Sequence, residues 1–166
     1  MRISIALCML SQLFLVGCAF NPQQVELTPQ VAVAASNQGK SIALGIKVLD
    51  ERSSNALGHR GAGPGWGDAA EITLKQDLAV TAHQQVVSGF TSKGFVPGDF
   101  NSVQGPKLSV EIRELEYTTS QGFWTGGVHV KGALKAVATK GGASYDRLYR
   151  VEKEEHNGGL TLTKWR

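Results

Sequence analysis

A strict alternation of apolar and polar side chains in the last third of the chain constrains the fold more than any other feature. The longest run spans residues 107–119 and is typical of a half-buried strand. Its apolar side consists of Leu108, Val110, Ile112 and Leu115. The alternation slips by one residue near Glu114, which predicts a β-bulge there. Residues 128–139 and 145–151 repeat the alternation, so the sequence predicts three consecutive strands.

The first half of the domain contains two shorter strand patterns followed by a helix pattern. Residues 41–49 and 69–75 alternate, whereas apolar side chains at spacings of three and four predict a helix over residues 78–93. We expect Asp77 to cap its start and Gly94 to end it. These side chains form an apolar stripe along one face of the predicted helix, made of Leu78, Ala82, Val86 and Phe90, with Ala79 and Val87 beside it.

These elements together predict the α+β fold class. We expect a two-layer sandwich in which one helix packs on one face of a mostly antiparallel sheet of about five strands, in the order β-β-α-β-β-β.

The N-terminus has the pattern of a lipoprotein signal peptide over residues 1–17. Arg2 supplies the positive charge, and the apolar run that follows is shorter than the about 20 residues that span a bilayer. Leu15-Val16-Gly17-Cys18 has the form of a lipobox, which predicts that Cys18 carries palmitate-type acyl chains. Several such chains anchor a protein stably in a membrane. Ala19 follows Cys18 where Asp would favour retention at the inner membrane, so we expect the periplasmic face of the bacterial outer membrane.

The remaining chain divides into a tether and one domain. Residues 18–40 contain many linker-type residues and predict a lipidated, flexible tether, although Val31 and Val33 could instead dock as an edge strand. Residues 41–166 are expected to form a single periplasmic domain. The formal net charge of +3 is too small to indicate nucleic acid as a partner.

The sequence contains no motif that indicates catalysis, a cofactor or a metal. Cys8 lies in the signal and Cys18 in the lipobox, which leaves the domain without a thiol. The glycine-rich segment 57–67 is expected to be a loop, because it lacks both the phosphate-loop and the dinucleotide-binding order. We therefore expect a non-catalytic module that binds an envelope protein, glycan or lipid.

Large aromatic side chains in predicted loops are the candidates for partner binding, because exposed aromatic residues usually pack or bind. These candidates are Trp66, Phe123 and Trp124. The alternative is an enzyme, or an accessory protein of carbohydrate processing, and it needs several polar groups to converge in one cleft. Those groups are His59, His129 and a carboxylate from Glu111 or Glu114.

Short motifs along the chain resemble the YajG-like family of uncharacterised bacterial lipoproteins. The similarity rests on the lipobox, on residues 48–52, on Leu78, Ala82 and Lys93-Gly94-Phe95 around the helix, on residues 108–117, and on Tyr149-Arg150-Val151-Glu152. The resemblance implies a membrane-anchored periplasmic domain of unknown function, with no recognised catalytic site.

The C-terminal segment departs from that family, whose members continue into a further amphipathic helix on the sheet. Gly158 and Gly159 disfavour such a helix, and Leu160, Leu162 and Trp165 alternate as in a strand. We expect the family helix to be missing and the bare apolar face to favour self-association or a partner.

Overall fold

The computed structural model describes residues 21–61, 68–121, 126–156 and 159–161. Within these residues the chain forms one helix and a nine-stranded sheet. The elements are β1 (Gln23–Val25), β2 (Ala43–Asp50), β3 (Ala56–Gly61), β4 (Asp68–Leu74), α2 (Leu78–Ser92), β5 (Val96–Asp99), β6 (Lys107–Gln121), β7 (Gly126–Lys140), β8 (Ala143–His156) and β9 (Gly159–Thr161).

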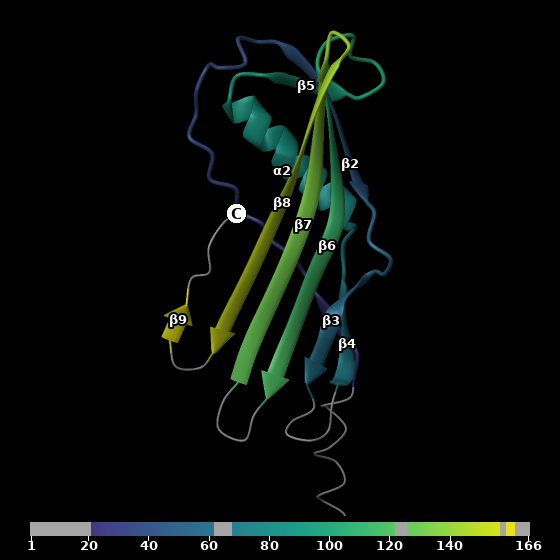
Figure 1. Cartoon of the computed structure of the whole chain (residues 1–166), viewed down its shortest axis with the longest axis vertical. Helices are drawn as coiled ribbons and strands as arrows, with labels where there is room; N and C mark the ends of the chain where they lie inside the picture. The colour runs from purple at the N-terminus through teal and green to yellow at the C-terminus, as the bar shows by residue number, and fades with distance from the viewer. Residues whose placement is uncertain (1–20, 62–67, 122–125, 157–158, 162–166) are drawn as a thin grey trace, which may run out of the picture.

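Three long antiparallel strands, β6, β7 and β8, form the centre of the molecule (Figure 1). The predicted bulge is confirmed, because the β6–β7 register shifts between Ile112 and Glu114. Gly141 and Gly142 join β7 to β8 with φ angles of 57° and 83°. Positive φ at both positions of a two-residue turn matches the twist of a hairpin and suits glycine. β9 then pairs antiparallel with the end of β8.

The other edge of β6 is shared by two groups of strands. β2 lies parallel to its first half, from Gly45 beside Lys107 to Asp50 beside Ile112, and β5 lies parallel to β2. β3 lies parallel to the second half of β6 and continues the sheet through β4 to β1. Figure 1 shows β3 and β4 at the lower end of the long strands, with β2 above them.

The expected two-layer sandwich with a mostly antiparallel sheet of about five strands is wrong. The pairings β1–β4, β2–β5, β2–β6 and β3–β6 are parallel, so the sheet is mixed. The physical reason is the connection between β2 and β6. The chain leaves β2, forms the β3–β4 hairpin and returns through α2, so β6 starts at the same end as β2 and runs in the same direction.

The glycine-rich segment that was expected to be a loop begins as strand β3. Gly58 has a φ of 152°, and a Cβ at this position would lie 2.1 Å from the backbone oxygen of Tyr117 in β6. No side chain fits in that space, so glycine here permits β3 to approach β6 closely. Gly58 is therefore a strand residue and does not indicate a loop.

Helix α2 agrees with its prediction. The Asp77 carboxylate accepts a hydrogen bond from the Val80 amide at 3.1 Å and caps the first turn. At the other end, the Phe95 amide donates to the Phe90 carbonyl oxygen at 3.1 Å, and the two rings meet edge to face with centroids 5.5 Å apart. The helix packs on β2 and β6, where the core consists of Leu44, Ile46, Leu108 and Val110, with Val86, Val87, Phe90 and Phe95 against it.

The segment expected to be a tether contacts the domain over its described part. Gln23–Val25 forms β1 and pairs with β4. The side-chain amide of Gln76 donates a hydrogen bond to the Leu27 carbonyl oxygen at 2.6 Å. Farther along, the Ser36 and Gly39 amides donate to carbonyl oxygens at the C-terminal end of α2. Val31 and Val33 lie beside α2, and the edge strand in this segment is β1.

Candidate functional site

An apolar groove lies between helix α2 and the three long strands. Its volume is about 420 Å³. One wall is the predicted helix stripe of Leu78, Ala82, Val86 and Phe90. The floor and the far side come from β6, β7 and β8, through Leu108, Val110, Ile112, Leu115, Gly132, Leu134, Ala136, Tyr149 and Val151. The groove is therefore built by elements that are distant in the sequence.

The groove exists because the sheet is wider than the single helix that packs on it. Residues of β6 under the helix are buried, with Val110 and Ile112 at 7% and 5% exposure. On β7 and β8 the apolar side chains are much more exposed, with Leu134 at 41%, Tyr149 at 45% and Val151 at 42%. Figure 1 shows α2 across the upper part of the long strands, which extend past it. The apolar face of the sheet thus continues beyond its cover.

The charged residues that line the groove come from two strands, Glu114 from β6 and Arg150 from β8. The Arg147 guanidinium lies 5.2 Å from the centre of the Tyr149 ring, a cation–π distance. The groove can hold an apolar chain along its floor. The arginines of β8 can then contact a polar group of the same ligand at the edge of the groove.

The histidines and carboxylates of the enzyme alternative do not converge. The His129 Nε2 lies 2.9 Å from the Glu152 Oε1 across β7 and β8, whereas His59 stands opposite Glu71 across β3 and β4. Glu111 accepts hydrogen bonds from Arg113, and these bonds hold its pKa below the usual value. A lowered pKa is opposite to what a general acid at neutral pH needs. Within the described residues, no three His, Cys, Asp or Glu side chains gather where they could hold a metal ion.

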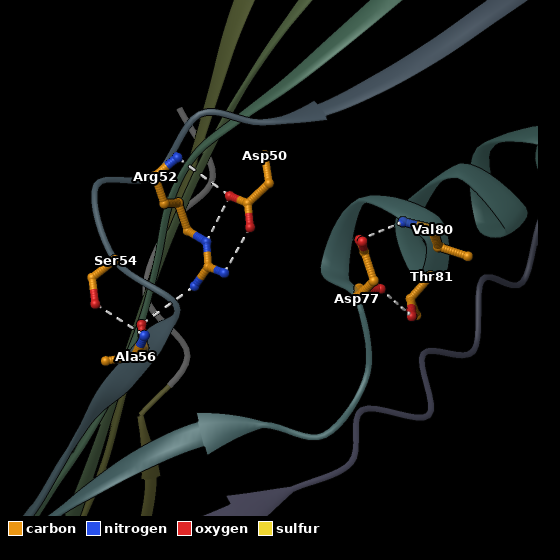
Figure 2. Close-up of polar contacts among 7 residues, drawn as sticks. All are labelled: Asp50, Arg52, Ser54, Ala56, Asp77, Val80 and Thr81. Carbon is orange, nitrogen blue, oxygen red and sulfur yellow. Dashed lines mark hydrogen bonds and ion pairs between the residues drawn. The ribbon is translucent and has the colours of Figure 1, made fainter.

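A second polar cluster lies near the start of α2 and fixes the β2–β3 turn (Figure 2). The Arg52 Nε and Nη2 donate to the two carboxylate oxygens of Asp50 at 2.8 Å each, and Nη1 donates to the Ala56 carbonyl oxygen at 3.3 Å. These bonds from Arg52 lower the pKa of Asp50, although partial burial opposes them. Arg52 is 6% exposed in its side chain, so the pair is a structural clamp.

The predicted partner-binding residues Trp66, Phe123 and Trp124 and the predicted lipidation site Cys18 lie outside the described residues. In the sequence, Trp66 stands between β3 and β4, and Phe123 and Trp124 stand between β6 and β7. Arg60 and Thr119 pair near the ends of β3 and β6, so these two strands end at the same end of the sheet.

Sequence reasoning identified the helix wall of the groove but not its role. The alternation over residues 145–151 predicted the strand that carries the far side, but not that Tyr149 and Val151 line a groove with the helix. No helix among the described residues is long and apolar enough to cross a membrane.

Within the described residues, the chain is a mostly-strand domain in which helix α2 covers part of a mixed sheet. The family model described as "Uncharacterized lipoprotein" matches residues 29–164, and the chain belongs to this family. The match confirms the resemblance to the YajG-like lipoproteins. As a lipoprotein of this family, the protein is a membrane-anchored component of the cell envelope.

Solved structures are similar to the chain at low sequence identity. The chain is similar to a Xanthomonas campestris protein, XCC0632 of the DUF330 family, with 14% identity, a TM-score of 0.51 and 78% of each chain covered. It is also similar to an uncharacterized protein with 12% identity, a TM-score of 0.47 and 79% of each chain covered. A search of the curated proteins gives no significant match.

Proposed function

We propose that the protein is a non-catalytic module, anchored through acyl chains on Cys18 to the periplasmic face of the outer membrane, that binds an acyl chain of another envelope component. The observation that carries this proposal is the apolar groove between α2 and β6, β7 and β8. The groove volume lies within the roughly 300–1,000 Å³ of typical ligand sites.

The chemistry of the lining favours an acyl chain over a glycan. Sugar hydroxyls need hydrogen-bond partners, and burying them without partners costs several kcal/mol. The groove offers aliphatic and aromatic side chains such as Leu134, Tyr149 and Val151. Its exposed apolar residues gain from contact with hydrocarbon, at about 25 cal/mol per Å² removed from water.

The proposed location follows from the sequence together with the family. Membership in a lipoprotein family supports a membrane anchor, and Cys18 in its lipobox is the residue we expect to carry it. Ala19 in place of Asp supports export to the outer membrane. A domain held at a membrane surface meets acyl chains at high local concentration.

The non-catalytic part of the proposal rests on the pairing of the described polar groups. His129 is engaged with Glu152, Glu111 with Arg113, and Asp50 with Arg52. None of these three pairs lines the groove, where the charged residues among the described lining are Glu114 and Arg150.

Photo-crosslinking of the full chain in intact cells tests the occupant. A photoreactive amino acid in place of Leu134 faces the groove, whereas the same residue in place of Lys135 points to the opposite face of β7, where Lys135 now lies 3.7 Å from Asp146. We expect irradiation to add a lipid mass at position 134 and not at position 135. A protein adduct at position 134, or equal adducts at both positions, would contradict the proposal.

A further inference from the structure

The outer edge of β8 is open along most of its length. Among the described residues, β8 pairs with β7 over Ala143–His156 on one side, but with β9 only over Glu154–His156 on the other. Residues 143–153 thus form an edge of eleven residues without a neighbouring strand in the described part of the chain. This stretch contains neither a proline nor a register shift, which are common means of protecting an edge.

The turn that precedes β8 determines which backbone groups face this edge. Lys140 and Ala143 flank the two-residue turn and pair with each other, so Ala143 directs its N–H and C=O toward β7. Residues alternate along a strand, and the groups that face the open edge therefore belong to Ser144, Asp146, Leu148, Arg150 and Glu152.

Apolar side chains accompany the open edge on both faces of the sheet. Tyr145, Tyr149 and Val151 lie on the face that carries α2, with exposures of 73%, 45% and 42%. Leu148 lies on the opposite face and is 45% exposed. An exposed edge with exposed apolar side chains is a template for pairing with another strand.

The charges on β8 complement those of a second β8 in antiparallel orientation. With Leu148 opposite its own copy, Asp146 stands opposite Arg150 twice, once on each side of the two-fold axis. On the other face, Tyr145 stands opposite Val151 and Arg147 opposite Tyr149, which keeps apolar and cation–π partners together.

Registers centred on Arg147, Tyr149 or Arg150 bring like charges together. Moving the centre to Arg147 or to Arg150 places that arginine opposite itself, and moving it to Tyr149 places Asp146 opposite Glu152. Like charges directly opposite each other destabilise a strand pair. Leu148 is also the midpoint of residues 143–153, so the register favoured by charge uses the whole open edge.

We infer that the protein forms a symmetric dimer in which the β8 strands of two copies pair antiparallel, centred on Leu148. The two-fold axis is perpendicular to the sheet, so both α2 helices lie on the same face. Tyr149 and Val151, on the far side of the groove, then lie beside Arg147 and Tyr145 of the second copy, and the two grooves share one floor. The pairing depends on β8 and holds whatever ligand the groove binds.

Disulfide formation in cells that express the full chain tests the register. In the dimer the Cα atoms of the two Leu148 residues are about 5.5 Å apart, within the range that a disulfide spans. The two Ser144 residues are about 27 Å apart, at about 3.4 Å per residue along antiparallel strands. We expect Leu148→Cys to form a covalent dimer on oxidation and Ser144→Cys to remain monomeric. Both variants keep Cys18, so its contribution is the same.

A charge exchange provides a second measurement on the purified full chain in detergent. Asp146→Arg or Arg150→Asp alone places like charges opposite each other, and we expect sedimentation to show half the parent mass. The double variant Asp146→Arg/Arg150→Asp restores opposite charges and the dimer, which a folding defect would not do.

A monomeric parent chain, equal crosslinking of both cysteine variants, or loss of the dimer without recovery in the double variant would overturn the inference. A monomer in which residues 162–166 of the same chain cover the β8 edge is one form of that result.

Discussion

Arg52 and Arg113 each pair with an acidic residue two positions earlier, but their surroundings differ. The Arg52 side chain is 6% exposed and bonds both Asp50 oxygens and the Ala56 carbonyl, whereas the Arg113 side chain is 50% exposed. We expect Arg52→Ala to lower the free energy of unfolding by about 2 kcal/mol, because it removes charge-assisted hydrogen bonds in a nearly enclosed site. Urea denaturation of the full chain measures this loss.

Arg113→Ala is the matched control, since it removes the same type of side chain from an exposed pair with Glu111. Exposed ion pairs contribute little, so we expect a much smaller change than for Arg52→Ala. Equal losses in the two variants would show that the enclosure of Arg52 does not determine the strength of its pair.

The Asp50 carboxylate also predicts a pH dependence. Its pKa in the folded protein lies below the ordinary value of 3.8, mainly through the hydrogen bond from the Arg52 side chain. Asp50 therefore contributes stability above about pH 3.8 that is lost as the pH falls through the folded pKa. We expect the urea midpoint to decrease from pH 5 toward pH 2, and to decrease less in Asp50→Asn. Asp99 and Glu111, whose pKa values are also lowered, account for part of the remaining slope. The same slope in both proteins would contradict this role of Asp50.

Helix α2 forms one wall of the groove, and its N-cap residue, Asp77, is expected to contribute to the free energy of unfolding. Asp77 accepts from the Val80 amide and its backbone oxygen accepts from Thr81 (Figure 2). We expect Asp77→Ala to reduce the free energy of unfolding by about 1 kcal/mol, because it leaves an amide of the first turn without its side-chain acceptor. Thermal denaturation followed by circular dichroism measures the change. Ser88→Ala in the exposed middle of the same helix should instead be neutral or slightly stabilising, since alanine is the better helix former.

Long elements with regular periodicity could be predicted from the sequence, and short strands could not. The pattern of residues 107–119 predicted most of β6 and its bulge, and the stripe with Asp77 and Gly94 predicted α2. β1, β5 and β9 are three or four residues long, which is too short for a periodic pattern to appear. β3 was read as a loop because its glycines suggested a turn, whereas Gly58 permits a close approach to Tyr117 that depends on the tertiary structure.

Only one wall of the groove, the helix wall, could be predicted from the sequence. The stripe of Leu78, Ala82, Val86 and Phe90 is visible in the sequence, since a helix places these residues on one face. Leu134, Tyr149 and Val151 alternate as any half-buried strand does, and the sequence cannot show that the helix leaves them exposed. That exposure follows from the parallel β2–β6 pairing, which positions α2 over β2 and β6 instead of β8.

At the scale of the whole molecule, helix α2 covers part of the sheet that the described residues form, and it leaves an apolar groove and an open edge side by side. Both features involve β8, which has exposed side chains on both faces and, among the described residues, no neighbouring strand on its outer edge over residues 143–153. An exported domain with such surfaces benefits from being held in one place, because a membrane anchor raises the local concentration of both ligand and second copy.

The anchor predicts different outcomes for the two cysteines of the chain. Cys18 stands at the end of the predicted lipobox, whereas Cys8 lies inside the apolar part of the predicted signal. We expect Cys18→Ser to abolish labelling of the protein by an alkyne analogue of palmitate and to remove it from the outer-membrane fraction, because serine cannot form the thioether that carries the lipid. Cys8→Ser should keep both the label and the location, since the apolar run of the signal remains. Retained label in Cys18→Ser would show that the lipid is attached elsewhere, and the groove would then lie at a different distance from the membrane than the lipobox implies.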